Sequence, residues 1–142
     1  MNAPSTIAPR ITLIGGPTAL IEVGGFRLLT DPTFDGPGEY RLPYTTLTKT
    51  SRPALTAEAV GTIDAVLLSH DQHFDNLDHA GRAWLAQAER VFTTRAGAER
   101  LGGRARGLSP WEHVGLAGSD GADLRLTATP ARHGPAALRL EG

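Results

Sequence analysis

One segment constrains the fold of this chain more than any other, because an apolar stretch runs directly into a polar cluster and then into a helical pattern. Residues Ile63–Leu68 are mostly apolar and have the length of a buried strand, and the cluster Ser69–Asp78 follows without a break. From Leu77 to Arg90 apolar residues recur at helical spacing, and Asp75 with Asn76 offers an N-cap. The cluster is therefore expected in a loop between strand and helix, where α/β proteins collect ligands and catalytic groups.

The polar cluster carries side chains that could converge on one metal ion. We expect His70, His73 and Asp75 to be ligands, because imidazole nitrogen and carboxylate oxygen suit zinc, manganese and iron. The chain has no cysteine, so any metal must be held by nitrogen and oxygen, a donor set that favours an open, hydrolytic site. Asp75 is also the candidate catalytic residue, which could orient the attacking water or accept its proton.

The rest of the chain predicts an α/β fold, because strand and helix patterns alternate. Strands are predicted at Ile11–Ile14, Ala19–Val23, Arg27–Thr30, Val91–Thr94 and Leu124–Thr129, and helices at Thr56–Val60 and Ala96–Leu101. A hairpin turn is predicted at Val23–Phe26. The stretch 31–53 is rich in proline and glycine, which indicates either a functional loop or local disorder.

Composition narrows the class of partner. A formal net charge of -1 with 20% charged residues gives no sign of a nucleic-acid or anionic-membrane surface, so a small-molecule substrate is expected. No apolar run approaches the roughly 20 residues needed to cross a bilayer. Residues 1–10 lack the features of a signal peptide, which favours a cytoplasmic location.

Ser69–Asp78 resembles the His-x-His-x-Asp-His signature of the metallo-β-lactamase superfamily, in particular its lactonase-like and phospholipase-D-like branch. Three further segments resemble that branch in the same order, namely Ile11–Gly16, Ala19–Pro32 and Thr129–Gly134. The resemblance implies a divalent metal cofactor of one or two ions, zinc with manganese or iron as alternatives. It also implies that His133 is a further metal ligand.

The cluster departs from the family signature in two ways. One extra residue separates the histidines, and Asn76 stands where a third loop histidine is expected. If Gln72 is the insertion, both His70 and His73 match the family. If the match is anchored on His73 instead, Asp71 takes the place of the first histidine. Because an amide oxygen is a poorer zinc ligand than imidazole, Asn76 bears on whether a second ion binds.

Other residues near the cluster receive supporting roles. Candidates for weak ligands, or for residues that orient the ligands, are Asp31, Asp71, Asn76 and Asp78. His79 and His113 are expected to be structural, and the arginines of residues 95–106 are expected on a solvated face. In the family that the chain resembles, the region corresponding to residues 31–53 borders the active site. Its aromatic residues are therefore expected either to contact substrate or to hold the loop against the core; they are Phe34, Tyr40 and Tyr44.

The family's complete fold is a four-layer αββα sandwich, and the resemblance implies that residues 1–142 correspond to its N-terminal half. We therefore expect a single domain, incomplete at its C-terminus, with an exposed sheet edge that could support homo-oligomers. The implied function is hydrolysis of a lactone, a phosphodiester or a related ester or amide by metal-activated water. The alternative is a non-catalytic, truncated or degenerate metal-binding relative.

Overall fold

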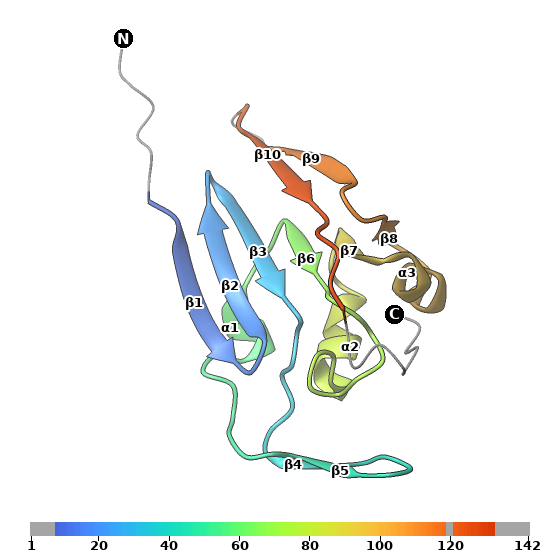
Figure 1. Ribbon diagram of the computed structural model, residues 1–142. Helices are drawn as coiled ribbons and strands as arrows, with labels where there is room; N and C mark the ends of the chain where they lie inside the picture. The colour runs from blue at the N-terminus through green and yellow to red at the C-terminus, as the bar shows by residue number, and fades with distance from the viewer. Residues whose placement is uncertain (1–7, 119–120, 133–142) are drawn as a thin grey trace.

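The computed structural model describes residues 8–118 and 121–132, and its main feature is a six-stranded mixed sheet (Figure 1). The strands are β1 (Arg10–Gly15), β2 (Thr18–Val23), β3 (Phe26–Thr30), β6 (Ala65–Leu67), β7 (Val91–Thr94) and β8 (Ala105–Leu108), in that order across the sheet. Strands β1 to β3 pair antiparallel, whereas β3, β6, β7 and β8 pair parallel. The α/β class is therefore confirmed.

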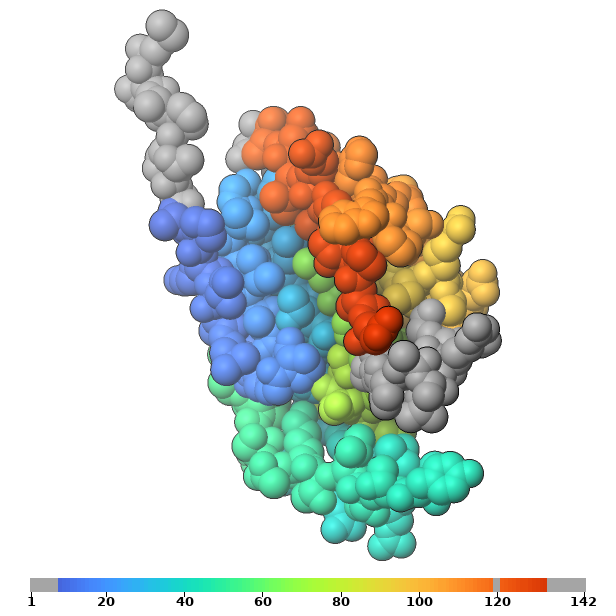
Figure 2. All heavy atoms as spheres, in the orientation of Figure 1, coloured from blue at the N-terminus to red at the C-terminus, as the bar shows by residue number. Residues whose placement is uncertain are grey.

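Three short helices and two separate hairpins complete the described part of the chain. The helices are α1 (Ala57–Val60), α2 (His79–Leu85) and α3 (Arg95–Leu101), and the hairpins are β4 (Gly38–Arg41) with β5 (Thr46–Lys49) and β9 (His113–Ala117) with β10 (Asp123–Thr127). None of the described helices is long and apolar enough to cross a membrane. The β4–β5 hairpin projects from the end of the molecule where β1 turns into β2 (Figure 2).

The sheet separates two apolar clusters, because successive side chains of a strand point to opposite faces. Leu29 and Val66 belong to the cluster that also contains Leu77 and the partly buried Trp84 from the α2 region. Leu28, the neighbour of Leu29, belongs to the second cluster, against which the β9–β10 hairpin packs. Both faces of the central strands are therefore covered, and their carboxyl ends lie at one edge of the sheet.

The helix that follows the polar cluster begins later and ends earlier than predicted. Asp78, rather than Asp75 or Asn76, is its N-cap, and the Asp78 side chain accepts a hydrogen bond from the backbone N–H of Gly81 at 2.8 Å. The preceding residues form a turn, since the N–H of Leu77 donates to the carbonyl of His73 at 2.9 Å. The helical spacing of apolar residues thus extends beyond the helix itself.

Several strands were not predicted. The breaker-rich stretch 31–53 contains the β4–β5 hairpin, whose residues are partly or fully exposed and so lack an apolar alternation. Strand β8 also lacks such an alternation. Strand β9 was missed although Val114 and Leu116 alternate with exposed residues and belong to the second cluster. The predicted strand Leu124–Thr129 exists as β10, but it pairs with β9 instead of joining the main sheet.

Candidate functional site

The candidate site lies where β3 and β6 end, as the sequence predicts for the polar cluster. Asp31 follows β3 directly, and its backbone N–H donates to the carbonyl of Leu67, the last residue of β6. The backbone φ of Asp31 is 29°, a left-handed value that non-glycine residues rarely adopt. Such strain is typical of functional positions held by their surroundings.

Asp31 fixes both ends of the loop 69–76. One carboxylate oxygen accepts the backbone N–H of Ser69 at 2.6 Å, and the other accepts the side-chain amide of Asn76 at 3.3 Å. Burial raises the pKa of the Asp31 carboxyl, and the hydrogen bonds from Ser69 and Asn76 oppose that effect. Asp31 therefore acts on the site through the loop that it holds, the role expected for a residue that orients ligands.

A chain of polar contacts runs from Asn76 to the two histidines. The Asn76 amide donates to the Ser69 hydroxyl at 2.8 Å, and that hydroxyl lies 3.0 Å from Nδ1 of His70. Nε2 of His70 in turn lies 3.0 Å from Nδ1 of His73, with the two rings perpendicular. The structure thus brings together His70 and His73 as the sequence predicts, and it adds Ser69 as the group that orients His70.

The histidine pair fits a metal ion in its donor chemistry. Two imidazole ligands of a tetrahedral zinc ion, with bonds of about 2.0–2.1 Å, have nitrogens roughly 3.3 Å apart, close to the 3.0 Å between His70 Nε2 and His73 Nδ1. The Ser69 hydroxyl has two lone pairs, so it can accept from both Asn76 and His70 Nδ1–H. Nε2 of His70 is then unprotonated, and its lone pair can accept from His73 Nδ1–H or bind a metal.

The remaining predicted ligands do not join this pair within the described residues. Across residues 8–118 and 121–132 no group of three histidine, aspartate or glutamate side chains is placed to hold a metal. Asp75 is exposed and lines a neighbouring pocket. His133 lies outside the described residues.

Asp71 anchors the loop to the helical side of the sheet. Its buried carboxylate forms an ion pair of 2.7 Å with Nη2 of Arg100 on α3, and Nε of the same guanidinium also donates to it. Its backbone carbonyl accepts a hydrogen bond of 2.6 Å from Arg82 on α2. Burial acts to raise the pKa of Asp71, but the hydrogen bonds and charge of Arg100 outweigh burial and lower it. Sequence reasoning missed the roles of Arg82 and Arg100, because both contacts join distant parts of the chain.

Replacement of Arg100 by alanine is expected to lower the free energy of unfolding by about 1–2 kcal/mol, because the buried Asp71 carboxylate loses its main partner. The matched control is Arg104→Ala, an exposed arginine close by in the chain. Urea unfolding measures the free energy of unfolding of both variants. Amide hydrogen exchange of residues 69–76 should become faster only in Arg100→Ala. Equal stability and equal exchange rates in the two variants would show that the Asp71–Arg100 ion pair does not anchor the loop.

Asp78 is fully buried and has four donors around its carboxylate. One oxygen accepts the backbone N–H groups of Phe34 and Gly81, and the other accepts that of Asp35 and the ammonium of Lys49 at 3.0 Å. Asp78 therefore ties the start of α2 to the segment before β4 and to the end of β5. With all four contacts engaged, it holds the fold of the loop and is not positioned as a weak metal ligand.

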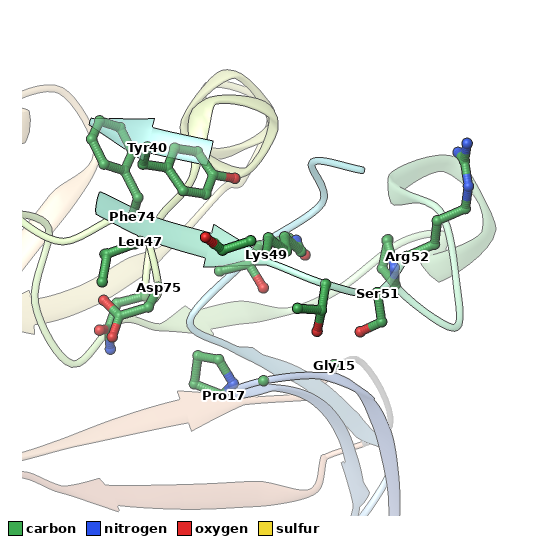
Figure 3. A pocket seen from close by; sticks show the side chains of 15 residues that line it. Gly15, Pro17, Tyr40, Leu47, Lys49, Ser51, Arg52, Phe74 and Asp75 are labelled. Atoms are coloured by element: carbon green, nitrogen blue, oxygen red, sulfur yellow. The ribbon is translucent and has the colours of Figure 1, made fainter. Parts of the chain in front are cut away.

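Two cavities flank the loop 69–76. The first, of about 470 Å³, lies between the β4–β5 hairpin and the β1–β2 turn, and Asp75 and Asn76 are among its lining residues. Asp75 lies on the same side of it as Leu47 and Phe74 (Figure 3). We call this cavity the hairpin pocket. The second, of about 870 Å³, includes Asp31 and Ser69 in its wall and extends along the ends of β7, β8 and β10. The loop therefore borders both cavities, and neither His70 nor His73 is among the described residues that line them.

The aromatic residues of the stretch 31–53 have different roles. Tyr40 stacks on Phe74, with ring centroids 4.7 Å apart and an angle of 9° between the planes, so it lies at the pocket. Phe34 is buried in the core beside Trp84, and Tyr44 is fully exposed. Of the three, only Tyr40 lines the hairpin pocket. His79 is exposed at the start of α2, as expected for a structural residue.

Comparisons with known proteins find a structure with a similar fold and several proteins with partial sequence similarity. No protein-family model matches the chain. Uncharacterised proteins of Mycobacterium bovis and Mycobacterium tuberculosis are 35% identical over 71 residues, which are 48% of this chain and 18% of those proteins. An isothiocyanate hydrolase from Delia radicum gut bacteria has a similar structure, with a TM-score of 0.58 and 20% identity over 80% of this chain and 45% of that one.

These findings correct the family assignment made from the sequence. Membership of the metallo-β-lactamase superfamily is not upheld, because no family model matches and the similarity found is to an isothiocyanate hydrolase and to uncharacterised mycobacterial proteins. The short signature has an extra residue and has Asn76 in place of a histidine, and it was not sufficient to assign the family. The chain is an α/β protein with a mixed six-stranded sheet, similar in fold to a hydrolase and spanning less than half of the proteins that it resembles.

Proposed function

We propose that this chain belongs to a hydrolase whose reaction centre lies at the histidine pair of the loop 69–76. The observation that carries the proposal is the convergence of His70 Nε2 and His73 Nδ1 at the carboxyl ends of two central strands, between two cavities. The fold similarity to an isothiocyanate hydrolase supports the same class of reaction. The hairpin pocket reaches the loop at residues 74–76, directly after His73, so a substrate bound there would lie beside this loop.

We further propose that His70 and His73 hold a divalent metal ion, with His133 as a candidate third ligand. A bound divalent ion would supply a Lewis acid that polarises the substrate and favours ionisation of water. Ser69 would keep Nε2 of His70 directed at the ion, and Asp31 would keep Ser69 and Asn76 in place. The exposed carboxylate of Asp75 would accept a proton from the attacking water.

The test is hydrolysis by purified protein of an isothiocyanate, a lactone, a carboxylic ester and a phosphodiester, before and after treatment with a chelator. The proposal expects turnover of at least one class, its loss of more than about 100-fold on chelation, and its return with zinc, manganese or iron. If chelation leaves turnover unchanged, the proposal that the reaction depends on a metal is wrong. If metal-loaded protein hydrolyses none of these substrate classes, the proposal that the protein is a hydrolase is wrong.

A second candidate function is non-catalytic metal binding. It is favoured by Asn76, which stands in place of a third loop histidine and whose amide nitrogen donates to Asp31 and Ser69. Stoichiometric metal binding without hydrolysis of any substrate class would select this alternative.

A further inference from the structure

We propose that the hairpin pocket binds a neutral substrate group with a flat, apolar face, such as an aryl ring. This inference rests on the proposed function, because it names the substrate class of the same site. The pocket has the volume of a small-molecule site, about 470 Å³, and it opens beside Asp75 and Asn76. A group seated in it would place its attached carbonyl or isothiocyanate carbon near the loop that carries the histidines.

Beside Asp75 and Asn76, part of the pocket wall is formed by apolar and aromatic side chains. Phe74, which immediately follows His73, lies in a parallel stack with Tyr40, and Leu47 lies beside them (Figure 3). Pro17 from the β1–β2 turn faces them across the cavity. Aromatic rings stacked or tilted against such faces contribute about 0.5–1.5 kcal/mol beyond the burial of their area. The wall therefore favours a ring over a small alkyl group.

The charges around the pocket disfavour an anionic substrate. Lys49 lines the cavity, but its ammonium lies 3.0 Å from the fully buried carboxylate of Asp78, so its charge is compensated. Arg52 also borders the pocket, yet its guanidinium extends away from the Phe74 end (Figure 3). At the Phe74 end itself lies the exposed carboxylate of Asp75, which repels an anion.

The Tyr40 hydroxyl does not supply a donor for an anion either. It donates to the carboxylate of Asp35 at 2.8 Å, and that carboxylate also accepts the backbone N–H of Ala80. Burial together with Asp35 raises the pKa of Tyr40, so the ring stays neutral. Among the substrate classes under the proposed function, neutral aryl esters, lactones and isothiocyanates therefore fit this pocket, and phosphodiesters do not.

The test uses two ligands that share a benzyl ring and differ in charge, N-benzylacetamide and benzylphosphonate, with binding measured by calorimetry or ligand-observed NMR. We expect N-benzylacetamide to bind about ten-fold more tightly than benzylphosphonate. Phe74→Ala should weaken N-benzylacetamide by about five-fold, the loss of one aromatic contact. The control Tyr44→Ala removes an aromatic side chain that is fully exposed in the β4–β5 hairpin, and it should leave binding unchanged.

Two further variants keep the result interpretable. Phe74→Leu retains an apolar side chain if Phe74→Ala unfolds, and it too should weaken N-benzylacetamide. Asp75→Asn should reduce the ratio of the two affinities by about five-fold, because it removes the repulsion between one exposed carboxylate and the phosphonate at contact distance.

The outcomes separate this inference from the proposed function. Equal or tighter binding of benzylphosphonate, binding of neither ligand, or a Phe74 variant that behaves like Tyr44→Ala would overturn the pocket assignment even if the protein hydrolyses a substrate. The expected binding pattern without hydrolysis of any substrate would leave the pocket standing and remove the proposed reaction.

Discussion

Replacement of His73 by alanine is expected to lower the affinity for zinc by more than about 100-fold. Removal of a residue that only orients a metal ligand costs up to about 100-fold, and loss of a ligand should cost more. The reason is that His73 Nδ1 faces His70 Nε2 at 3.0 Å, so one of two convergent donors is lost. Competition with a chromophoric chelator measures the affinity, and hydrolysis of the best substrate should fall with it.

The control for this variant is His113→Ala. His113 is exposed at the start of β9, on a hairpin that packs against the opposite side of the sheet from α2. Its removal should leave zinc affinity within about two-fold of the native value, as for surface changes away from a site. Similar losses in both variants would show that zinc binds to histidines in general and not to this pair.

Replacement of Asp78 by alanine is expected to produce the largest loss of stability, about 3–5 kcal/mol. The change removes a fully buried carboxylate and leaves three backbone N–H groups without their acceptor, while the Lys49 ammonium keeps only the Thr33 carbonyl at 3.3 Å. Urea unfolding at neutral pH measures the free energy of unfolding. The hairpin pocket should open at the same time, because Lys49 belongs to its wall.

The control here is Asp123→Ala, an exposed aspartate at the start of β10, which should change the free energy of unfolding by less than about 0.5 kcal/mol. A loss below about 1 kcal/mol in Asp78→Ala would mean that water replaces the carboxylate readily. In that case Asp78 would become available again as a weak ligand near the loop.

The parts of the fold that depend on neighbours in the chain could be predicted from the sequence. Thr56 caps α1 by accepting from the N–H of Ala59, and Val23–Phe26 forms the turn between β2 and β3, with Gly24 and Gly25 at positive φ. The position of the histidine loop after β6 was also predicted, because an apolar run followed by polar residues marks the end of a buried strand.

Contacts between distant residues could not be predicted in the same way. The carboxylates of Asp71 and Asp78 looked like candidates for the metal site from their spacing alone. Their partners, Arg100 and the Phe34 backbone, lie 29 and 44 residues away in the chain, and only the folded structure brings them together. For a similar reason a short polar motif suggested a family that the comparisons do not support.

Long-range proton–nitrogen NMR during a zinc titration shows which nitrogen of each imidazole is protonated, and it therefore tests whether His70 and His73 bind the metal. Zinc is expected to fix His70 with its proton on Nδ1, directed at Ser69, and His73 with its proton on Nε2, while His113 keeps its spectrum. Spectra of His70 and His73 that do not change at stoichiometric zinc would contradict the account, because the pair would then hold no metal.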